Sequence, residues 1–69
     1  MATTAPEFDR QAHYDAATEA QRTMHPSQLV ILITTLSGRV GQLAQGDPQR
    51  KRLLAELDAA QDEAIRRMR

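Results

Sequence analysis

The sequence contains no cysteine and no tryptophan, and it has only one phenylalanine and one tyrosine. The lack of cysteine excludes disulfide bridges and zinc sites built on thiolates. A chain of 69 residues buries a smaller share of its surface than a larger domain does, and small domains compensate with disulfides, a metal or oligomerisation. Because His13 and His25 are the only nitrogen ligands available, oligomerisation is the expected means of stabilisation.

The sequence also lacks an excess of charge of either sign and any long apolar run. Nine basic residues balance nine acidic ones, whereas a nucleic-acid-binding protein usually has an excess of positive charge overall or on one face. The longest apolar run, residues 29–33, is far shorter than the roughly 20 residues that a membrane-spanning helix needs. The first residues have neither a basic start nor an apolar run. We therefore expect no signal peptide, no membrane partner and a cytoplasmic location.

Proline occurs only three times, each time where a helix can begin, since proline suits the first turn of a helix. The prolines predict three helices, at about residues 6–23, 26–45 and 48–68. The expected fold class is therefore all-α, with a single domain over residues 1–69. Within it, a peripheral N-terminal helix (residues 1–24) packs outside a helical hairpin core (residues 26–69).

The expected first helix has a capping box and little apolar surface. Thr4 can accept a hydrogen bond from a backbone N–H three residues on, while the Glu7 side chain reaches back. Its apolar residues recur every four positions, at Phe8, Ala12, Ala16 and Ala20. Alanine favours a helix but contributes little packing, so we expect this helix to dock loosely on the outside.

The expected second helix carries a seam of large apolar residues. They are spaced four, three, four and three positions apart, at Leu29, Ile33, Leu36, Val40 and Leu43. This spacing is typical of the seam of a coiled coil. Val30, Ile31 and Leu32 extend the apolar surface around the first half of the helix. A helix that is apolar on all sides is buried on all sides, so this half is expected at the centre of an assembly.

The same helix has a second face of small residues, formed by Thr34, Ser37, Gly38 and Gly41. Small residues allow another helix to approach closely, but glycine also weakens a helix by about 1 kcal/mol relative to alanine. A competing interpretation makes residues 29–35 a β-strand, because this segment is rich in β-branched residues. The segment has no alternation of period two, and the three–four spacing continues beyond it, which favours the helix.

The turn between the second and third helices is signalled by residues 45–48, Gln-Gly-Asp-Pro. Gly46 can take the left-handed conformation that ends a helix. Asp47 can cap the next helix, with Pro48 in its first turn. Such a short connection predicts an antiparallel helical hairpin.

The expected third helix completes the hairpin with a second apolar line, at Leu53, Leu57, Ala60 and Ala64. Its outer face carries Asp62 and Glu63, each four residues before an arginine, which predicts the pairs Asp62–Arg66 and Glu63–Arg67. Two such hairpins are expected to form a four-helix bundle by dimerisation.

These patterns favour a small non-enzymatic protein–protein interaction module that acts as a helical homo-oligomer, with a dimer as the expected form. Its role would be that of an adaptor, regulator, inhibitor or assembly factor, and a protein partner is expected. The predicted oligomer or partner interface consists of Leu29, Ile33, Leu36, Val40, Leu43, Leu53, Leu57, Ala60 and Ala64. No nucleophile constellation, phosphate loop or cofactor fingerprint is present, so we expect no catalytic residue and no cofactor.

The alternative function is a small dimeric regulator that binds nucleic acid. Arg50, Lys51 and Arg52 lie at the start of the third helix, where cations oppose the helix dipole. Local stability therefore does not explain them, and they could bind an anionic partner. A metal site would need His13, His25 and further ligands from elsewhere, and we expect none.

Overall fold

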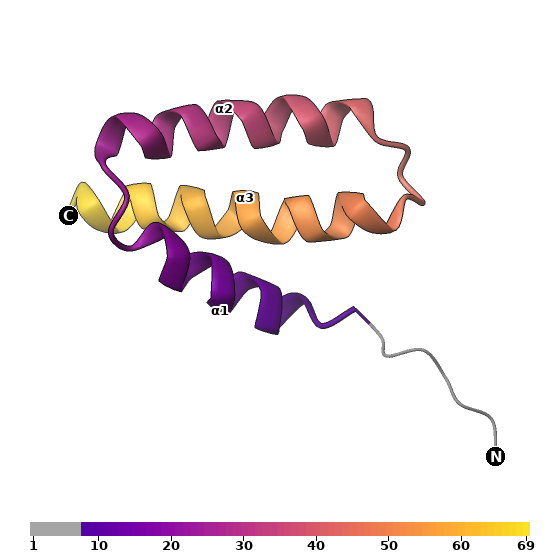
Figure 1. The fold of residues 1–69 in the computed structure, drawn as a ribbon, viewed down its shortest axis with the longest axis horizontal. Helices are drawn as coiled ribbons and strands as arrows, with labels where there is room; N and C mark the ends of the chain where they lie inside the picture. Colours follow the sequence, from indigo (N-terminus) through magenta and orange to yellow (C-terminus); the bar gives the residue numbers. More distant parts are fainter. Residues whose placement is uncertain (1–7) are drawn as a thin grey trace, which may run out of the picture.

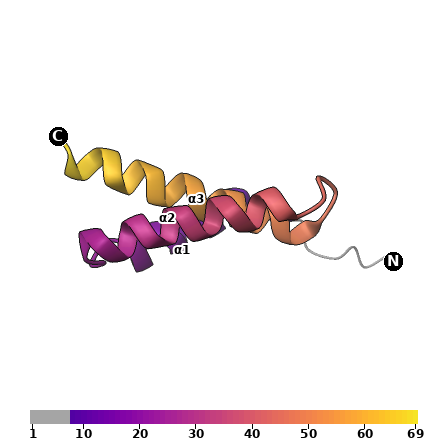
Figure 2. The same cartoon turned by 90° about the horizontal axis from the view of Figure 1, so that it is seen from above.

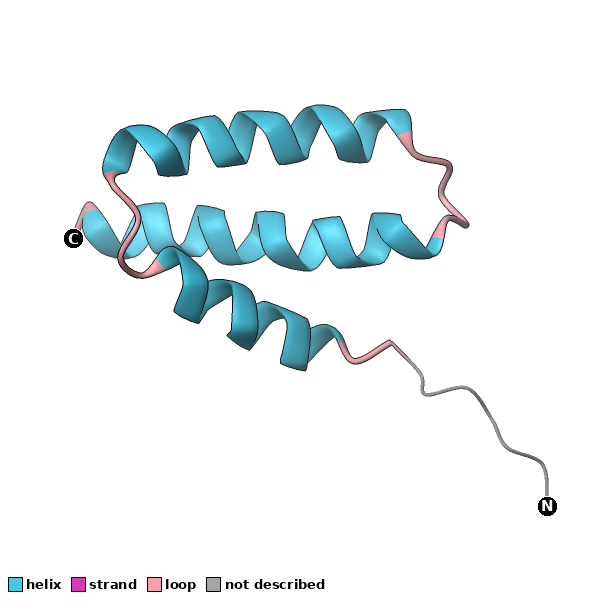
Figure 3. Ribbon diagram, in the orientation of Figure 1, coloured by secondary structure: helices cyan, strands magenta, loops and turns pink. Residues whose placement is uncertain are grey.

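The computed structural model describes residues 8–69, which form three α-helices: α1 (Arg10–Gln21), α2 (Pro26–Gln42) and α3 (Pro48–Arg67). Figure 3 shows that helices and loops account for the whole of this described part, without a strand. The all-α prediction is thus confirmed. The alternative that residues 29–35 form a strand is excluded, since they lie inside α2.

The three helices lie in one layer, with α3 in the middle (Figure 1). Helix α3 contacts both α1 and α2, whereas the latter two hardly contact each other. The Cα atoms span 49 × 24 × 16 Å. Helix α2 runs antiparallel to α3, as the predicted hairpin requires, and α1 runs in the same general direction as α3.

The contact between α2 and α3 forms the apolar core. Its buried members are Leu29, Leu36 and Val40 from α2 with Leu57 and Ala60 from α3. These residues belong to the two predicted apolar lines, so the three–four spacing correctly identifies the faces that bring the hairpin together. Each large apolar side chain that becomes fully buried contributes about 1.5–3 kcal/mol to folding.

Helix α1 packs on the other side of α3, where Ala55 and Ala59 are both fully buried. The residues of α1 with reduced exposure are His13, Tyr14, Ala17, Thr18 and Gln21. The alanines that recur every four residues, Ala12, Ala16 and Ala20, are all exposed and contribute no packing against α3. Hydrogen bonds and ion pairs to α3, described below, orient the helix in place of an apolar stripe.

Each helix begins at a side chain that accepts a hydrogen bond from the backbone. Asp47 Oδ1 accepts from the N–H of Gln49 at 2.9 Å, which confirms the predicted cap of α3. His25 caps α2, with Pro26 as the first helical residue. The predicted start of the first helix at residue 6 is wrong, since α1 begins at Arg10 and Asp9 Oδ1 caps it by accepting from Ala12 at 3.0 Å. The capping box proposed for Thr4 and Glu7 lies outside the described residues.

The end of α2 also differs from the prediction. The helix ends at Gln42, three residues early, and Leu43 is already extended with φ −93° and ψ 142°. No glycine in the described part of the chain has positive φ, so the left-handed conformation expected at Gly46 is wrong. Because the chain leaves α2 in an extended conformation, the loop to α3 is long enough to turn without a left-handed residue.

Candidate interaction surface

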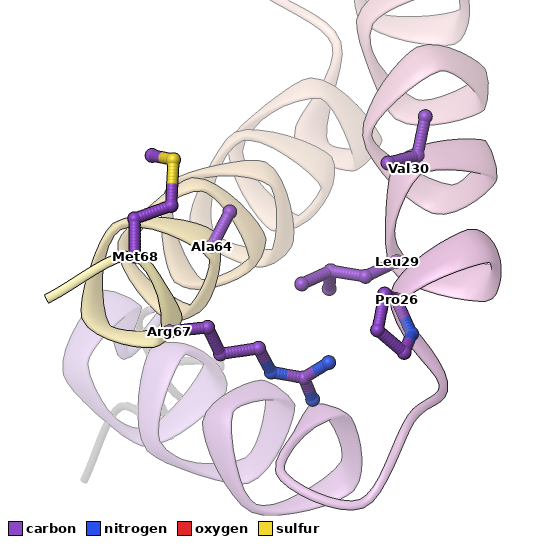
Figure 4. A pocket seen from close by; sticks show the side chains of 6 residues that line it. All are labelled: Pro26, Leu29, Val30, Ala64, Arg67 and Met68. Atoms are coloured by element: carbon purple, nitrogen blue, oxygen red, sulfur yellow. The ribbon is translucent and has the colours of Figure 1, made fainter.

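The hairpin opens at one end into an apolar groove. Figure 2 shows α2 and α3 crossing, so that the N-terminal end of α2 and the C-terminal end of α3 diverge. The space between them is a groove of about 360 Å³. It is lined by Pro26, Leu29 and Val30 from α2 and by Ala64, Arg67 and Met68 from α3 (Figure 4). Apart from Arg67, the side chains that line it are apolar.

Large apolar side chains remain exposed on the helices that form this groove. The exposed fractions are 63% for Val30, 65% for Ile31, 46% for Ile65 and 79% for Met68. All four belong to the N-terminal half of α2 or the C-terminal end of α3. Val30 and Met68 line the groove itself. Scattered apolar residues are normal on a protein surface, whereas exposed apolar side chains gathered at a groove are typical of a binding site.

The predicted interface residues fall into two groups. Leu29, Leu36, Val40, Leu57 and Ala60 are buried within the single chain. Ile33, Leu43, Leu53 and Ala64 are only half-buried and retain surface that a partner could contact. Whether any of them contacts a partner stays a prediction. Ile65 and Met68 lie outside the predicted set, since they fall beside the apolar line of the third helix, and both remain exposed.

An ion-pair cluster borders the groove at the end of α1. Glu63 Oε2 accepts from Arg67 Nε at 2.9 Å, and Glu63 Oε1 accepts from Arg66 at 3.1 Å. Arg67 also donates to the backbone carbonyls of Gln21 and Arg22, at 3.0 and 3.2 Å. These carbonyls end α1, where a cation is favourable. Arg67 therefore connects α1, α3 and the groove.

The predicted pair Glu63–Arg67 is thus confirmed, but Arg66 pairs with Glu63 in place of Asp62. The Glu63 side chain is only 10% exposed. Hydrogen bonds from Arg67 and then Arg66 lower the pKa of Glu63 from its ordinary value of 4.5. A carboxylate whose pKa is lower in the folded state stabilises the fold above its unfolded pKa, and the contribution is lost as the pH falls through the folded value.

We therefore expect the melting temperature to fall as the pH is lowered from about 6 through the folded pKa of Glu63. Glu63→Gln should show a smaller loss over the same range, because the amide does not titrate. Thermal melts followed by circular dichroism measure both proteins. Glu19→Gln is the matched control, since Glu19 pairs with Arg22 at 3.5 Å but its side chain is 74% exposed. Equal losses in Glu63→Gln and the unchanged protein would contradict this role.

Two further polar contacts attach α1 to α3. The Tyr14 hydroxyl donates to Asp62 Oδ2 at 2.5 Å, and Arg10 pairs with Asp58. Both pairs join residues 48 positions apart, as expected for helices that run in the same direction. The sequence shows Asp58 and Asp62 only as acids that share one face of a helix, and nothing in their spacing identifies Arg10 or Tyr14 as partners.

The predicted anionic-partner patch lies at the start of α3, remote from the groove. Lys51 and Arg52 are exposed, while Arg50 is half-buried. The arrangement offers two freely accessible cations on one helical turn. It contains no aromatic side chain on which a base could stack.

The two histidines have local roles. His25 caps α2, and its Nδ1 lies 2.9 Å from Ser27 Oγ. The His13 ring stacks on Phe8, with centroids 4.9 Å apart. Within residues 8–69 no three His, Cys, Asp or Glu side chains are grouped so that they could hold a metal ion.

None of the three described helices combines the length and hydropathy that a membrane crossing requires. Comparison of the chain with protein-family models, with curated proteins and with solved structures finds no match.

Proposed function

We propose that this chain is a non-enzymatic protein–protein interaction module that acts as a helical homo-oligomer, with the dimer as its basic unit. It would serve as an adaptor, regulator, inhibitor or assembly factor. The observation that supports this is the single layer of helices with an apolar groove at its open end. Stable domains bury their apolar faces between at least two packed layers, and a second copy would supply the missing layer.

In the proposed dimer, the α2–α3 hairpins of two copies form a four-helix bundle. Val30 and Met68, which border the groove and are 63% and 79% exposed, would become buried between the copies. Burial of such side chains contributes roughly 1.5–3 kcal/mol each. The polar contacts of α1 with α3 leave that helix on the outside, where it does not block the groove.

The test introduces charge at the groove without touching the core. The double variant carries Val30→Glu and Met68→Glu. Because both residues are exposed in the single chain, this variant should keep the helicity of the unchanged protein. A buried charge without a partner is costly, so we expect the dimer dissociation constant to rise at least about 100-fold, equivalent to about 2.7 kcal/mol. Sedimentation equilibrium measures the constant, and circular dichroism measures the helicity.

The matched control is Thr35→Glu, which adds charge at an exposed position of the same helix away from the groove. It should leave the dissociation constant within a few-fold of its original value. Equal dissociation constants for the double variant and the unchanged protein would refute the groove as the interface.

The alternative function is binding of nucleic acid by a dimer through Arg50, Lys51 and Arg52. The exposure of Lys51 and Arg52 is the observation that favours it. Binding of this kind weakens steeply with salt, because phosphate contacts release counterions. Fluorescence anisotropy with random single- and double-stranded DNA and RNA at low and moderate salt tests it. Salt-dependent binding that is lost in the triple alanine variant would support it, and absence of binding at low salt would exclude it.

A further inference from the structure

We infer that the partner of α2 is α2 of a second copy, packed antiparallel to it with the two-fold axis near Thr34. This inference rests on the proposed homo-oligomer and specifies which helices meet and in what register. It concerns the outward side of α2, which continues from the groove at Val30 along the length of the helix.

The outward side of α2 carries an exposed stripe that is symmetric about its middle residue. Its members are spaced three, four, four and three positions apart, at Ser27, Val30, Thr34, Gly38 and Gly41, and all five are exposed. Residues at these intervals lie on one side of an α-helix. Ile31 borders the stripe and is 65% exposed.

This side of α2 lacks charge. The helix spans 17 residues and contains a single charged one, Arg39, which lies off the stripe. In contrast, α1 and α3 carry several charged residues each. A two-fold contact places identical residues close to one another near the axis, so a charged residue there would meet its own like charge. An uncharged stripe is therefore suited to a second copy.

Neither the packing nor the backbone conformation of the single chain requires glycine at the two glycine positions of the stripe. A Cβ atom added to Gly38 or Gly41 would meet nothing within 4 Å, and neither residue has positive φ. Packing and backbone conformation would thus both accept alanine, which favours a helix more strongly. Close approach of another helix accounts for two glycines in an exposed helix. The exposed apolar side chains of Val30 and Ile31 nearby would be covered by the same helix.

The antiparallel direction follows from the distribution of side-chain size along the stripe. The bulky residues Val30 and Ile31 precede Thr34, and the glycines follow it. An antiparallel two-fold axis at Thr34 puts the bulky half of each helix opposite the small half of the other. The axes of the two α2 helices then stay equally far apart over the whole contact. The two helix dipoles point in opposite directions, which is favourable. A parallel pair would put bulky residues against bulky ones and splay apart.

Cysteine cross-linking tests the register, because the chain has no cysteine of its own. Cα atoms must lie about 4.4–6.8 Å apart for a disulfide. Thr34→Cys at the axis should therefore form a disulfide with its own copy under mild oxidation. Ser27→Cys should not pair with itself, because the two copies of residue 27 would be roughly 20 Å apart at 1.5 Å per residue. A mixture of Ser27→Cys and Gly41→Cys should give the mixed dimer.

The matched control is Thr35→Cys, an exposed neighbour on another side of α2, which should not cross-link efficiently. Self-linking of Ser27→Cys, or cross-linking of Thr35→Cys as fast as Thr34→Cys, in a protein of dimeric mass would overturn this register while leaving the proposed homo-oligomer intact. A monomeric mass at every concentration would overturn both.

A second variant tests the close approach without oxidation. A Cβ atom added to Gly38 meets nothing within 4 Å in the single chain, and the residue is exposed. Gly38→Leu should therefore retain its helicity, while the dimer dissociation constant should rise at least about tenfold. Thr35→Leu adds similar bulk at an exposed position off the stripe and should leave the constant unchanged. An unchanged dissociation constant in Gly38→Leu would overturn the inference.

Discussion

Leu36→Ala is expected to lower the free energy of unfolding by about 2–5 kcal/mol. Leu36 lies in the middle of α2 and is only 3% exposed. Its helix packs on α3, whose buried residues include the small Ala60. Small neighbours have few atoms with which to fill a cavity, so the cost of the substitution should be high. Native proteins have a total stability of about 5–15 kcal/mol, so a loss of this size is a large share of the whole.

Urea titration followed by circular dichroism measures this loss at a fixed protein concentration. Thr35→Ala is the control, since Thr35 neighbours Leu36 in sequence but is exposed. It should change the stability by no more than about 0.5 kcal/mol. A loss in Leu36→Ala that matches the control would show that the contact of α2 with α3 is not the core of the protein.

Arg67→Met is expected to release α1 from α3. The substitution keeps much of the aliphatic side chain but removes the hydrogen bonds to Glu63 and to the carbonyls of Gln21 and Arg22. The buried Glu63 carboxylate would then retain only Arg66. A net hydrogen bond to a charged group contributes about 1.5–3 kcal/mol, so amide protection in α1 should fall about ten- to a hundredfold.

Hydrogen exchange measured by NMR, amide by amide, follows this release. Protection in α2 should fall much less than in α1, because the core with α3 does not depend on Arg67. Arg69→Met serves as the control, since Arg69 is an exposed arginine near the same helix end. Unchanged protection in α1, or an equal loss in all three helices, would contradict the role of Arg67 as a connector.

The hairpin could be predicted from the sequence because large apolar residues determine it. The three–four spacing from Leu29 to Val40 identifies a helix face without reference to any neighbour. Asp47 and Pro48 mark the start of the next helix in the same local way. The prediction of a left-handed conformation at Gly46 is wrong because several backbone paths can connect two helices, and the sequence does not choose among them.

The position of α1 could not be predicted, because it depends on pairs between residues far apart in the chain. Tyr14 with Asp62 and Arg67 with the end of α1 have no local signature. Ala55 and Ala59 are fully buried, yet in the sequence they stand among acids that suggest an exposed face. The groove was likewise beyond prediction, since it arises from the angle at which α2 and α3 cross.

The central claim is that a second copy covers the apolar surface around the groove and the outward side of α2. Sedimentation equilibrium of the unchanged protein, from low micromolar to millimolar concentration, tests it most directly. We expect a reversible rise in mass to twice the 7.7 kDa of one chain, with thermal stability rising in parallel because the dimer binds only the folded state. A folded, thermally stable species that keeps the mass of a single chain throughout this range would contradict it.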